Sequence, residues 1–350
     1  MYYVGIDLHK RTVWICVLDS QGRRVHSIRL HAGPNSLKAF FKEVPRPFRV
    51  ALEATYNWYY VVDIAEQYAE KVYLANSYEL KAFAKRHKKN DKIDARLIAW
   101  LLQRGDLPTV TIADRTTRSI RELIGYRMRL VTDKTRNIVR LKALLDKLGM
   151  VAEGNYNTKR NREKVRQLPL RAPYEVIVRG YLERIERLGE ELKAIEKRIA
   201  ERAKQDRDMV NLMSVPGLNF FSAVLIKTEV IDIERFHSFP RLCAYSGLAP
   251  RVHASGGHCY YGPLNRNRRK YLQWILLENV SHAMRKIPRL KRKYLAIKRR
   301  KGSNTAKVAV ARDYLKLIYQ ILKEKRPWYP EEEYQRLKSQ SAEAPALIGV

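Results

Sequence analysis

The sequence has few acidic side chains, and basic ones outnumber them almost two to one. Asp and Glu number 36 among 350 residues, against 69 Lys and Arg, which gives a formal net charge of +33. A charge of that size repels itself and lowers the stability of the compact state unless a polyanion is the working partner. Nucleic acid is therefore the first candidate partner, and an anionic membrane surface is the second.

Cysteines and long apolar runs are also scarce. No stretch approaches the roughly 18 apolar residues needed to span a bilayer, and the start "MYYVGIDLHKRT" lacks the regions of a signal peptide. Cys16, Cys243 and Cys259 form no disulfide framework, so we expect a reducing cytoplasm and no membrane partner. An apolar fraction of 45% is that of a globular chain, long enough here for two or three domains.

Residues 1–106 predict an α/β domain with a mixed sheet. Three consecutive strands come first, and helices and strands then alternate, which is typical of a sheet covered by helices. The predicted strands are 3–8, 12–19, 23–30, 49–55 and 71–76. The first predicted helix is 35–44, opened by Asn35 or Ser36 as a cap. The others are a helix through Val61, Val62, Ile64 and Ala65, one near 77–84, and one from Asp91 to about Gln103.

Residues 107–207 predict a basic helix, a connector and a coiled coil. The helix, 115–148, has ten Lys/Arg and three Asp/Glu, and the polar segment 151–173 is expected to be a flexible connector. The next helix places apolar residues at alternating steps of three and four, a seam of about three heptads. Its seam residues are Val178, Tyr181, Ile185, Leu188, Leu192, Ile195 and Ile199. A helical hairpin packed on itself and a dimer seam both fit this pattern.

Residues 208–326 predict a third, mainly helical domain, and 327–350 a loose tail. The stretch "VPGLN", residues 215–219, is similar to a helix-hairpin-helix turn, whose backbone amides can hold a phosphate. A plain helix start with proline at its first position fits the same letters.

Four carboxylates stand out against the basic background. Asp7 lies inside the first apolar strand and Glu53 near the end of the fourth, and such acids are costly unless paired or bound to a cation. Asp91 and Asp94 are three residues apart, so they project from one face of a helix. Four such acids can converge on two divalent ions, and oxygen ligands favour Mg²⁺ or Mn²⁺.

Each of these acids also has an ordinary structural explanation. A D-x-x-D pair is common on helices, Asp7 can cap a turn, and Glu53 can pair with an arginine. Their order is more specific: a buried Asp on the first strand, a Glu on the fourth, and a helical Asp pair last. That combination resembles the RNase H-like (RuvC-like) fold of Holliday-junction resolvases.

The stretch "GLAPRVHASGGH", residues 247–258, contains a candidate nucleophile. Ser255 precedes two glycines, so its hydroxyl can sit on an open turn. Serine becomes a useful nucleophile only when a base or metal activates it and cations stabilise the developing charge. A serine that only stabilises a turn is the structural alternative. His253, His258, Cys243 and Cys259 lack the paired spacing typical of a zinc site.

Five motifs occur together in one order: "YVGIDLHK", "ALEAT", "KNDKIDARLIAWLLQRG", "SVPGLNFFSA" and "GLAPRVHASGG". In this order they resemble the DEDD transposases of the insertion-sequence one-ten family, relatives of the Piv-type DNA invertases. The resemblance spans nearly the whole chain. It implies that Asp7, Glu53, Asp91 and Asp94 bind metal, and that Ser255 forms a covalent phosphoserine link to DNA.

The same resemblance implies partners. They are a donor and a target DNA, a structured bridge RNA encoded beside the gene, and further copies of the chain in a dimer or tetramer. The active site would be completed between subunits, in the cytoplasm of a prokaryotic cell.

Three groups of basic residues are expected to contact these nucleic acids: the loop before Asp91, the helix 115–148, and residues 265–301, which hold fourteen Lys/Arg and one acid. Solvated faces normally mix both signs, so runs of one sign indicate polyanion backbones. The expected contacts are Lys85, Arg86, Lys88, Lys89, Arg118, Arg121, Arg129, Arg136, Arg140, Arg251, Arg266, Arg268 and Arg269.

The sequence therefore predicts a DNA transposase or recombinase with a metal-assisted serine nucleophile. Two alternatives stay open. One is a junction nuclease that uses metal-bound water, and the other is a non-catalytic nucleic-acid-binding protein that has kept the fold.

Overall fold

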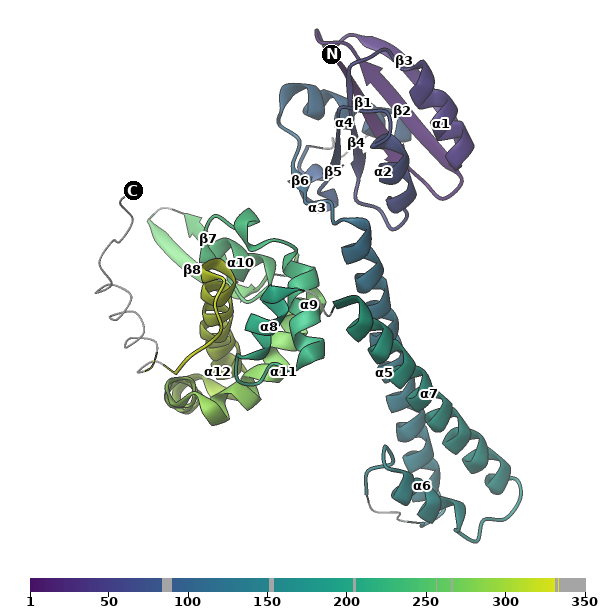
Figure 1. Ribbon diagram of the computed structural model, residues 1–350, viewed down its shortest axis with the longest axis vertical. Helices are drawn as coiled ribbons and strands as arrows, with labels where there is room; N and C mark the ends of the chain where they lie inside the picture. Colours follow the sequence, from purple (N-terminus) through teal and green to yellow (C-terminus); the bar gives the residue numbers. More distant parts are fainter. Residues whose placement is uncertain are drawn as a thin grey trace, which may run out of the picture. The chain divides into compact units, whose positions relative to one another are not determined.

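The computed structural model describes residues 1–83, 90–150, 154–203, 206–255, 257–265, 267–330 and 333, with only the backbone of Ala203, His253 and Ala254. The chain divides into two compact units, Met1–Ala113 and Asp114–Val350 (Figure 1). The finer division predicted from the sequence, with boundaries after residues 106, 207 and 326, stays a prediction.

The first unit is built on a mixed six-stranded sheet. Its strands are β1 (Tyr2–Leu8), β2 (Thr12–Leu18), β3 (Arg24–His31), β4 (Phe48–Glu53), β5 (Lys71–Ala75) and β6 (Thr109–Val110). They are ordered β3-β2-β1-β4-β5-β6. Strands β1, β2 and β3 pair antiparallel, β1–β4 and β4–β5 pair parallel, and β6 returns antiparallel along β5. The predicted mixed sheet is confirmed.

Helices cover both faces of this sheet, and the alternation along β1 decides which residues meet which helix. Val4, Ile6 and Leu8 belong to a core that includes residues of α1 (Pro34–Glu43) and α2 (Tyr59–Ala65). The opposite face packs under α4 (Asp91–Arg104), which contacts β1, β2 and β4. Asp7 alternates with the first set, so it faces α4.

The helices of the first unit differ from the predictions in detail. Helix α1 begins with Pro34 after Gly33 as its cap, without a side-chain hydrogen bond from Asn35 or Ser36, because proline's fixed φ suits the first helical position. The helix expected at 77–84 is the short α3 (Ser77–Leu80), followed by a turn. Strand β6, only two residues long, was not predicted.

In the second unit, α5 (Arg115–Lys147) and α7 (Tyr174–Ala203) pack side by side as a helical hairpin (Figure 1). Val178, Leu182 and Ile185 of α7 share a buried cluster with Leu141 and Leu145 of α5. The apolar seam of α7 therefore faces α5 of the same chain, as the hairpin interpretation expected. Leu188 and Leu192 are half-buried.

The connector between these helices is more structured than predicted. Residues Lys159–Arg166 form α6, whose cap Thr158 accepts a hydrogen bond from the Asn161 amide. Tyr156 and Val165 are buried in the hairpin cluster. The expectation of a flexible connector throughout 151–173 is thus wrong for this part, because two apolar side chains anchor it.

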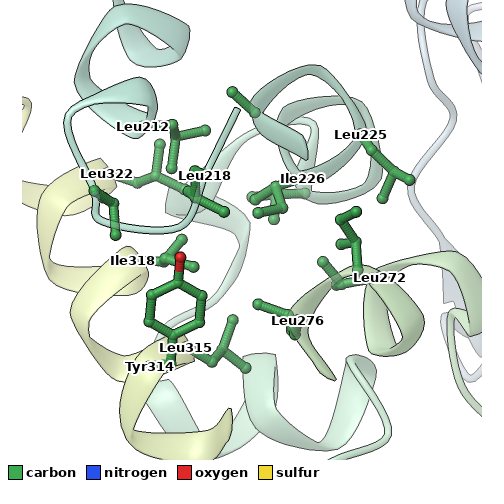
Figure 2. Close-up of a cluster of buried hydrophobic side chains, with 14 of the residues drawn as sticks. Leu212, Leu218, Leu225, Ile226, Leu272, Leu276, Tyr314, Leu315, Ile318 and Leu322 are labelled. Carbon is green, nitrogen blue, oxygen red and sulfur yellow. The ribbon is translucent and has the colours of Figure 1, made fainter. Parts of the chain in front are cut away.

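The rest of the second unit is mainly helical, as predicted, with the small two-stranded sheet of β7 and β8. Its elements are α8 (Arg207–Met213), α9 (Phe220–Val230), a 3-10 turn (Ile233–Arg235), α10 (Phe239–Tyr245), β7 (Pro250–Ser255), β8 (His258–Leu264), α11 (Lys270–Lys286) and α12 (Pro288–Glu324). Figure 2 shows the buried core shared by α8, α9, α11 and α12, which includes Tyr314. The Tyr314 hydroxyl donates to the Pro216 carbonyl at 2.9 Å.

The "VPGLN" turn joins α8 to α9. Asn219 caps α9, so Pro216 precedes the helix and is not its first residue. Gly217 has φ +92°, and a Cβ there would lie 2.8 Å from the Asn279 carbonyl oxygen of α11. Glycine is therefore required where the turn meets α11. No helix within the described residues is both long and apolar enough to cross a bilayer.

Candidate active site

Asp7 is the buried centre of the candidate site. Asp7 is only 6% exposed and lies on the sheet face that α4 covers. The Oδ2 atom lies 3.1 Å from Nε2 of His9, two residues further along the chain. The same His9 nitrogen lies 3.3 Å from Oδ2 of Asp91. One imidazole therefore joins an acid of β1 to an acid of α4.

The start of α4 determines where the aspartate pair lies. Asn90 caps the helix by accepting a hydrogen bond from the Lys92 amide, and Asp91 and Asp94 occupy the first turn. Acids are favoured there by the positive end of the helix dipole. Ala95 and Ile98 on the same helix are buried against the sheet. The predicted aspartate pair thus stands where α4 meets β1.

Glu53 ends β4 beside Asp7. The parallel β1–β4 ladder pairs Ile6 with Leu52, so the next residues along each strand are Asp7 and Glu53. Ligand atoms of Asp7, His9 and Asp91 all lie within 4.8 Å of one another. Among the described residues, Glu53 and Asp94 do not join so tight a group. The structure therefore brings two of the four predicted carboxylates together with His9 and places the other two beside them.

The electrostatics of this group favour a cation. Burial raises the pKa of Asp7 to about 6, His9 acts to lower it, and the charges of Asp91 and Asp94 raise it again. A carboxylate that is costly to ionise inside the fold gains most from a divalent ion beside it. Two carboxylates and an imidazole are a recognised donor set for such ions. The residues present fit a divalent metal.

Sequence reasoning missed His9. A lone histidine after a strand is common, and only the packing of α4 on β1 shows that it reaches two acids. The available signal was the spacing Asp-x-His at the end of an apolar strand.

The predicted nucleophile, Ser255, lies at the tip of a hairpin in the second unit. It is exposed and pairs with His258 across β7 and β8. Gly257 has φ +81°, a conformation that suits glycine at a tight turn. At the root of the hairpin, the Gln273 amide donates to the Gly247 carbonyl at 2.7 Å and Arg312 donates to the Leu248 carbonyl at 2.5 Å. The serine is presented on an anchored, solvent-facing strand end.

Comparison with known proteins agrees with these motifs. A family model for the IS110 DEDD transposase matches residues 4–150, and a second, described as "Transposase IS116/IS110/IS902 family", matches residues 209–295. The chain belongs to the IS110 family of transposases. The two matched regions include the carboxylates and the serine hairpin, respectively.

Individual relatives of this IS110-family chain are distant but nearly full-length. A "Probable family 20 transposase" of Pseudomonas aeruginosa is 23% identical, over 93% of this chain and 98% of its own. The "Transposase for insertion sequence element IS1111A" of Coxiella burnetii is 26% identical, over 91% of this chain and 89% of its own. The "Transposase for insertion sequence element IS1328" of Yersinia enterocolitica is 24% identical, over 79% of this chain and 81% of its own.

Four arginines expected on nucleic acid are buried or hydrogen-bonded within the transposase fold. Arg118 is buried, at 5% exposed. Arg121 donates to the Thr228 carbonyl at 3.0 Å, and Arg269 donates to the buried Glu229 at 2.6 Å. Arg268 donates to Gln273 at 2.6 Å and packs so close to Gly247 that a Cβ there would clash with it. We therefore leave these four out of the proposed nucleic-acid surface.

Four of the remaining arginines expected on nucleic acid lie on the surface. Arg129, Arg136, Arg140 and Arg251 are exposed, and Arg136 pairs with Asp133 at 3.3 Å. The exposed part of α12 adds a cleft lined by Arg289, Lys293, Asp313, Lys316, Leu317 and Gln320. Lys85, Arg86, Lys88, Lys89 and Arg266 lie outside the described residues.

The zinc interpretation gains no support. Cys243 is buried, and Cys259 and His258 are neighbours on a strand, so their side chains point to opposite faces. Among the described residues, Asp7, His9 and Asp91 form the one group with the geometry to hold a metal.

Proposed function

We propose that this transposase cuts and rejoins DNA by a metal-assisted serine mechanism, with Asp7, Glu53, Asp91 and Asp94 around the metal site and Ser255 as nucleophile. The observation that carries the proposal is the meeting of Asp7 and Asp91 across the β1–α4 contact, within 4.8 Å of one another and of His9. Two strand ends and one helix start supply the acids, in the order that the DEDD pattern requires.

The chemistry assigned to the chain is a transesterification. The Oγ atom of Ser255 forms an ester bond with a DNA phosphorus, and the bond from that phosphorus to a deoxyribose oxygen breaks. The proton of the serine hydroxyl ends on the departing deoxyribose hydroxyl. Because one phosphoester replaces another, the reverse reaction can rejoin a strand without an energy source.

The metal, Mg²⁺ or Mn²⁺, would supply Lewis-acid stabilisation of charge on the phosphoryl oxygens. The carboxylates of Asp7, Glu53, Asp91 and Asp94 would hold it, and the burial of Asp7 would strengthen the attraction by lowering the local dielectric constant. The exposed position of Ser255 leaves room for a DNA backbone.

The fold and the partners are proposed on related grounds. Three antiparallel strands followed by two parallel ones support the RNase H-like fold that the carboxylate order suggests. The net charge of +33 and the exposed basic residues of α5 and α12 support binding of donor DNA, target DNA and a guiding bridge RNA. Assembly into a dimer or tetramer, with a coiled-coil contribution from the α5–α7 hairpin, is proposed from the family resemblance.

The direct test of the metal-bound acids compares Asp91→Asn with Asp106→Asn. Asp106 follows the same helix and pairs with Arg104 at its far end, so it controls for loss of one negative charge. We expect Asp91→Asn to lose cleavage of labelled element-end DNA in Mg²⁺ while DNA affinity by fluorescence anisotropy is unchanged. Asp106→Asn should cleave normally. Equal cleavage by both variants would remove the carboxylate site from the proposal.

A further inference from the structure

We propose that His9 is itself a ligand of the metal and that it biases the site towards Mn²⁺ over Mg²⁺. This inference rests on the proposed function, because it concerns the same metal site. The DEDD pattern assigns four oxygen donors there, and the structure adds a nitrogen donor that the pattern does not contain.

The distances around His9 match those between neighbouring ligands of one ion. Donor atoms about 2.1 Å from an octahedral ion are separated by about 3 Å from their nearest neighbours. Nε2 of His9 lies 3.1 Å from Oδ2 of Asp7 and 3.3 Å from Oδ2 of Asp91. The imidazole nitrogen therefore already stands at a ligand position relative to both acids.

The backbone restrains His9 at this place. Its amide donates to the Thr12 carbonyl at 2.9 Å, which closes the turn between β1 and β2. The side chain of Asn57 approaches the His9 carbonyl oxygen at 3.4 Å. Because the backbone is held from both sides, the ring is kept within reach of Asp7 and Asp91.

The chemistry of the donor explains the metal preference. Mg²⁺ binds oxygen ligands and is poorly served by imidazole, whereas Mn²⁺ lies nearer the ions that accept nitrogen. A site of carboxylates alone would serve either ion. Replacing one oxygen or water ligand by the His9 nitrogen shifts the balance to Mn²⁺.

The test uses the full chain and Mn²⁺ as a paramagnetic probe. Electron spin-echo spectroscopy detects nitrogen directly bound to Mn²⁺. The variants are His9→Asn, the matched control His26→Asn on exposed β3, and Asp7→Asn to identify Mn²⁺ bound elsewhere. Calorimetric titrations with Mn²⁺ and with Mg²⁺ give the two affinities for each variant.

We expect an imidazole nitrogen signal in the wild type and in His26→Asn, and none in His9→Asn. Mn²⁺ affinity should fall about tenfold or more in His9→Asn, with a smaller change for Mg²⁺. Two results would overturn the role of His9 while leaving the carboxylate site in place. They are Mn²⁺ bound by the wild type without a nitrogen signal, and an unchanged Mn²⁺ affinity in His9→Asn. If Asp7→Asn binds Mn²⁺ as the wild type does, the proposed carboxylate site itself fails.

Discussion

Gly5 of β1 lies directly beneath the backbone of α4. A Cβ atom on Gly5 would stand 2.2 Å from the Ala95 carbonyl oxygen and 2.3 Å from the Ala99 amide nitrogen. No side chain fits in that space, so glycine sets how closely the helix approaches the strand. Asp7 follows two residues later on the same face, and Asp91 and Asp94 begin the same helix. The meeting of the acids thus requires this close approach of α4 to β1.

Gly5→Ala should therefore displace α4 and open the metal site. Overpacking of this kind costs about 1–3 kcal/mol, and we expect that loss in the free energy of unfolding together with weaker Mn²⁺ binding. The control is Gly180→Ala on α7, where a Cβ would meet nothing within 4 Å. Helix propensity predicts that this control is neutral or stabilising. Urea unfolding of both variants makes the comparison, and full stability of Gly5→Ala would contradict the close contact.

The pH dependence of stability should report the burial of Asp7. Burial raises the pKa of Asp7 from 3.8 to about 6, so the folded chain binds this proton more tightly than the unfolded chain. The stability that Asp7 contributes is therefore complete below about pH 4 and is lost as the pH rises through about 6. Asp7→Asn does not titrate. Without metal, its stability relative to the wild type should rise by about 1–3 kcal/mol between about pH 4.5 and pH 7.5.

Urea unfolding in a chelator at each pH measures this difference. Adding Mn²⁺ at about pH 7.5 should then stabilise the wild type and leave Asp7→Asn unchanged. If the difference in free energy of unfolding between Asp7→Asn and the wild type stayed constant with pH, Asp7 would not be buried as described.

The basic residues of the second unit should separate into DNA contacts and internal supports. Arg299→Gln with Arg300→Gln changes two exposed residues of α12. We expect weaker DNA binding and normal thermal stability. The slope of log binding constant against log salt concentration should become shallower by about 1–2. Arg269→Gln instead removes the 2.6 Å partner of the buried Glu229 and leaves it Arg121 at 3.8 Å. We expect this to cost about 1–3 kcal/mol of stability. Fluorescence anisotropy titrations at several salt concentrations and thermal melts of both variants make the comparison. If the two variants showed the same DNA affinity and the same melting temperature, this division would be wrong.

The sequence predicted the sheet well because its strands are short, apolar and separated by clear turns. Strands β1 to β5 begin and end within about two residues of their predicted limits. Strand β6 was missed because Thr109–Val110 is too short to show alternation and forms only by pairing with β5. The anchoring of residues 154–166 was missed because Tyr156 and Val165 stand alone in a polar segment, and only the hairpin gives them a partner.

The site was predictable in part, for similar reasons. Alternation along β1 and helical spacing after Asn90 place Asp7, Asp91 and Asp94 without knowledge of the fold. His9 and Arg269 needed the structure, because their roles depend on residues far away in the chain: Asp91 for the first and Glu229 for the second. One-signed charge identifies a polyanion-binding protein, but does not tell which arginines face solvent.

The role of Ser255 separates a recombinase from a nuclease that uses water. If its hydroxyl is the nucleophile, the cut DNA end stays esterified to the protein. Ser255→Ala should then lose the covalent link and the joined product, while Mn²⁺ still binds the unchanged carboxylates. Ser214, whose hydroxyl donates to the Asn211 carbonyl at 2.6 Å, gives the control variant Ser214→Ala, which keeps the hairpin serine intact.

The measurement that tests this account most directly is a denaturing gel of end-labelled DNA incubated with the chain, Mg²⁺ or Mn²⁺, and RNA transcribed from beside the gene. The account predicts a covalent protein–DNA band for the wild type and for Ser214→Ala, and no such band for Ser255→Ala or Asp91→Asn. Free cut ends without any covalent band, formed at equal rates by the wild type and Ser255→Ala, would contradict it and make Ser255 a turn residue.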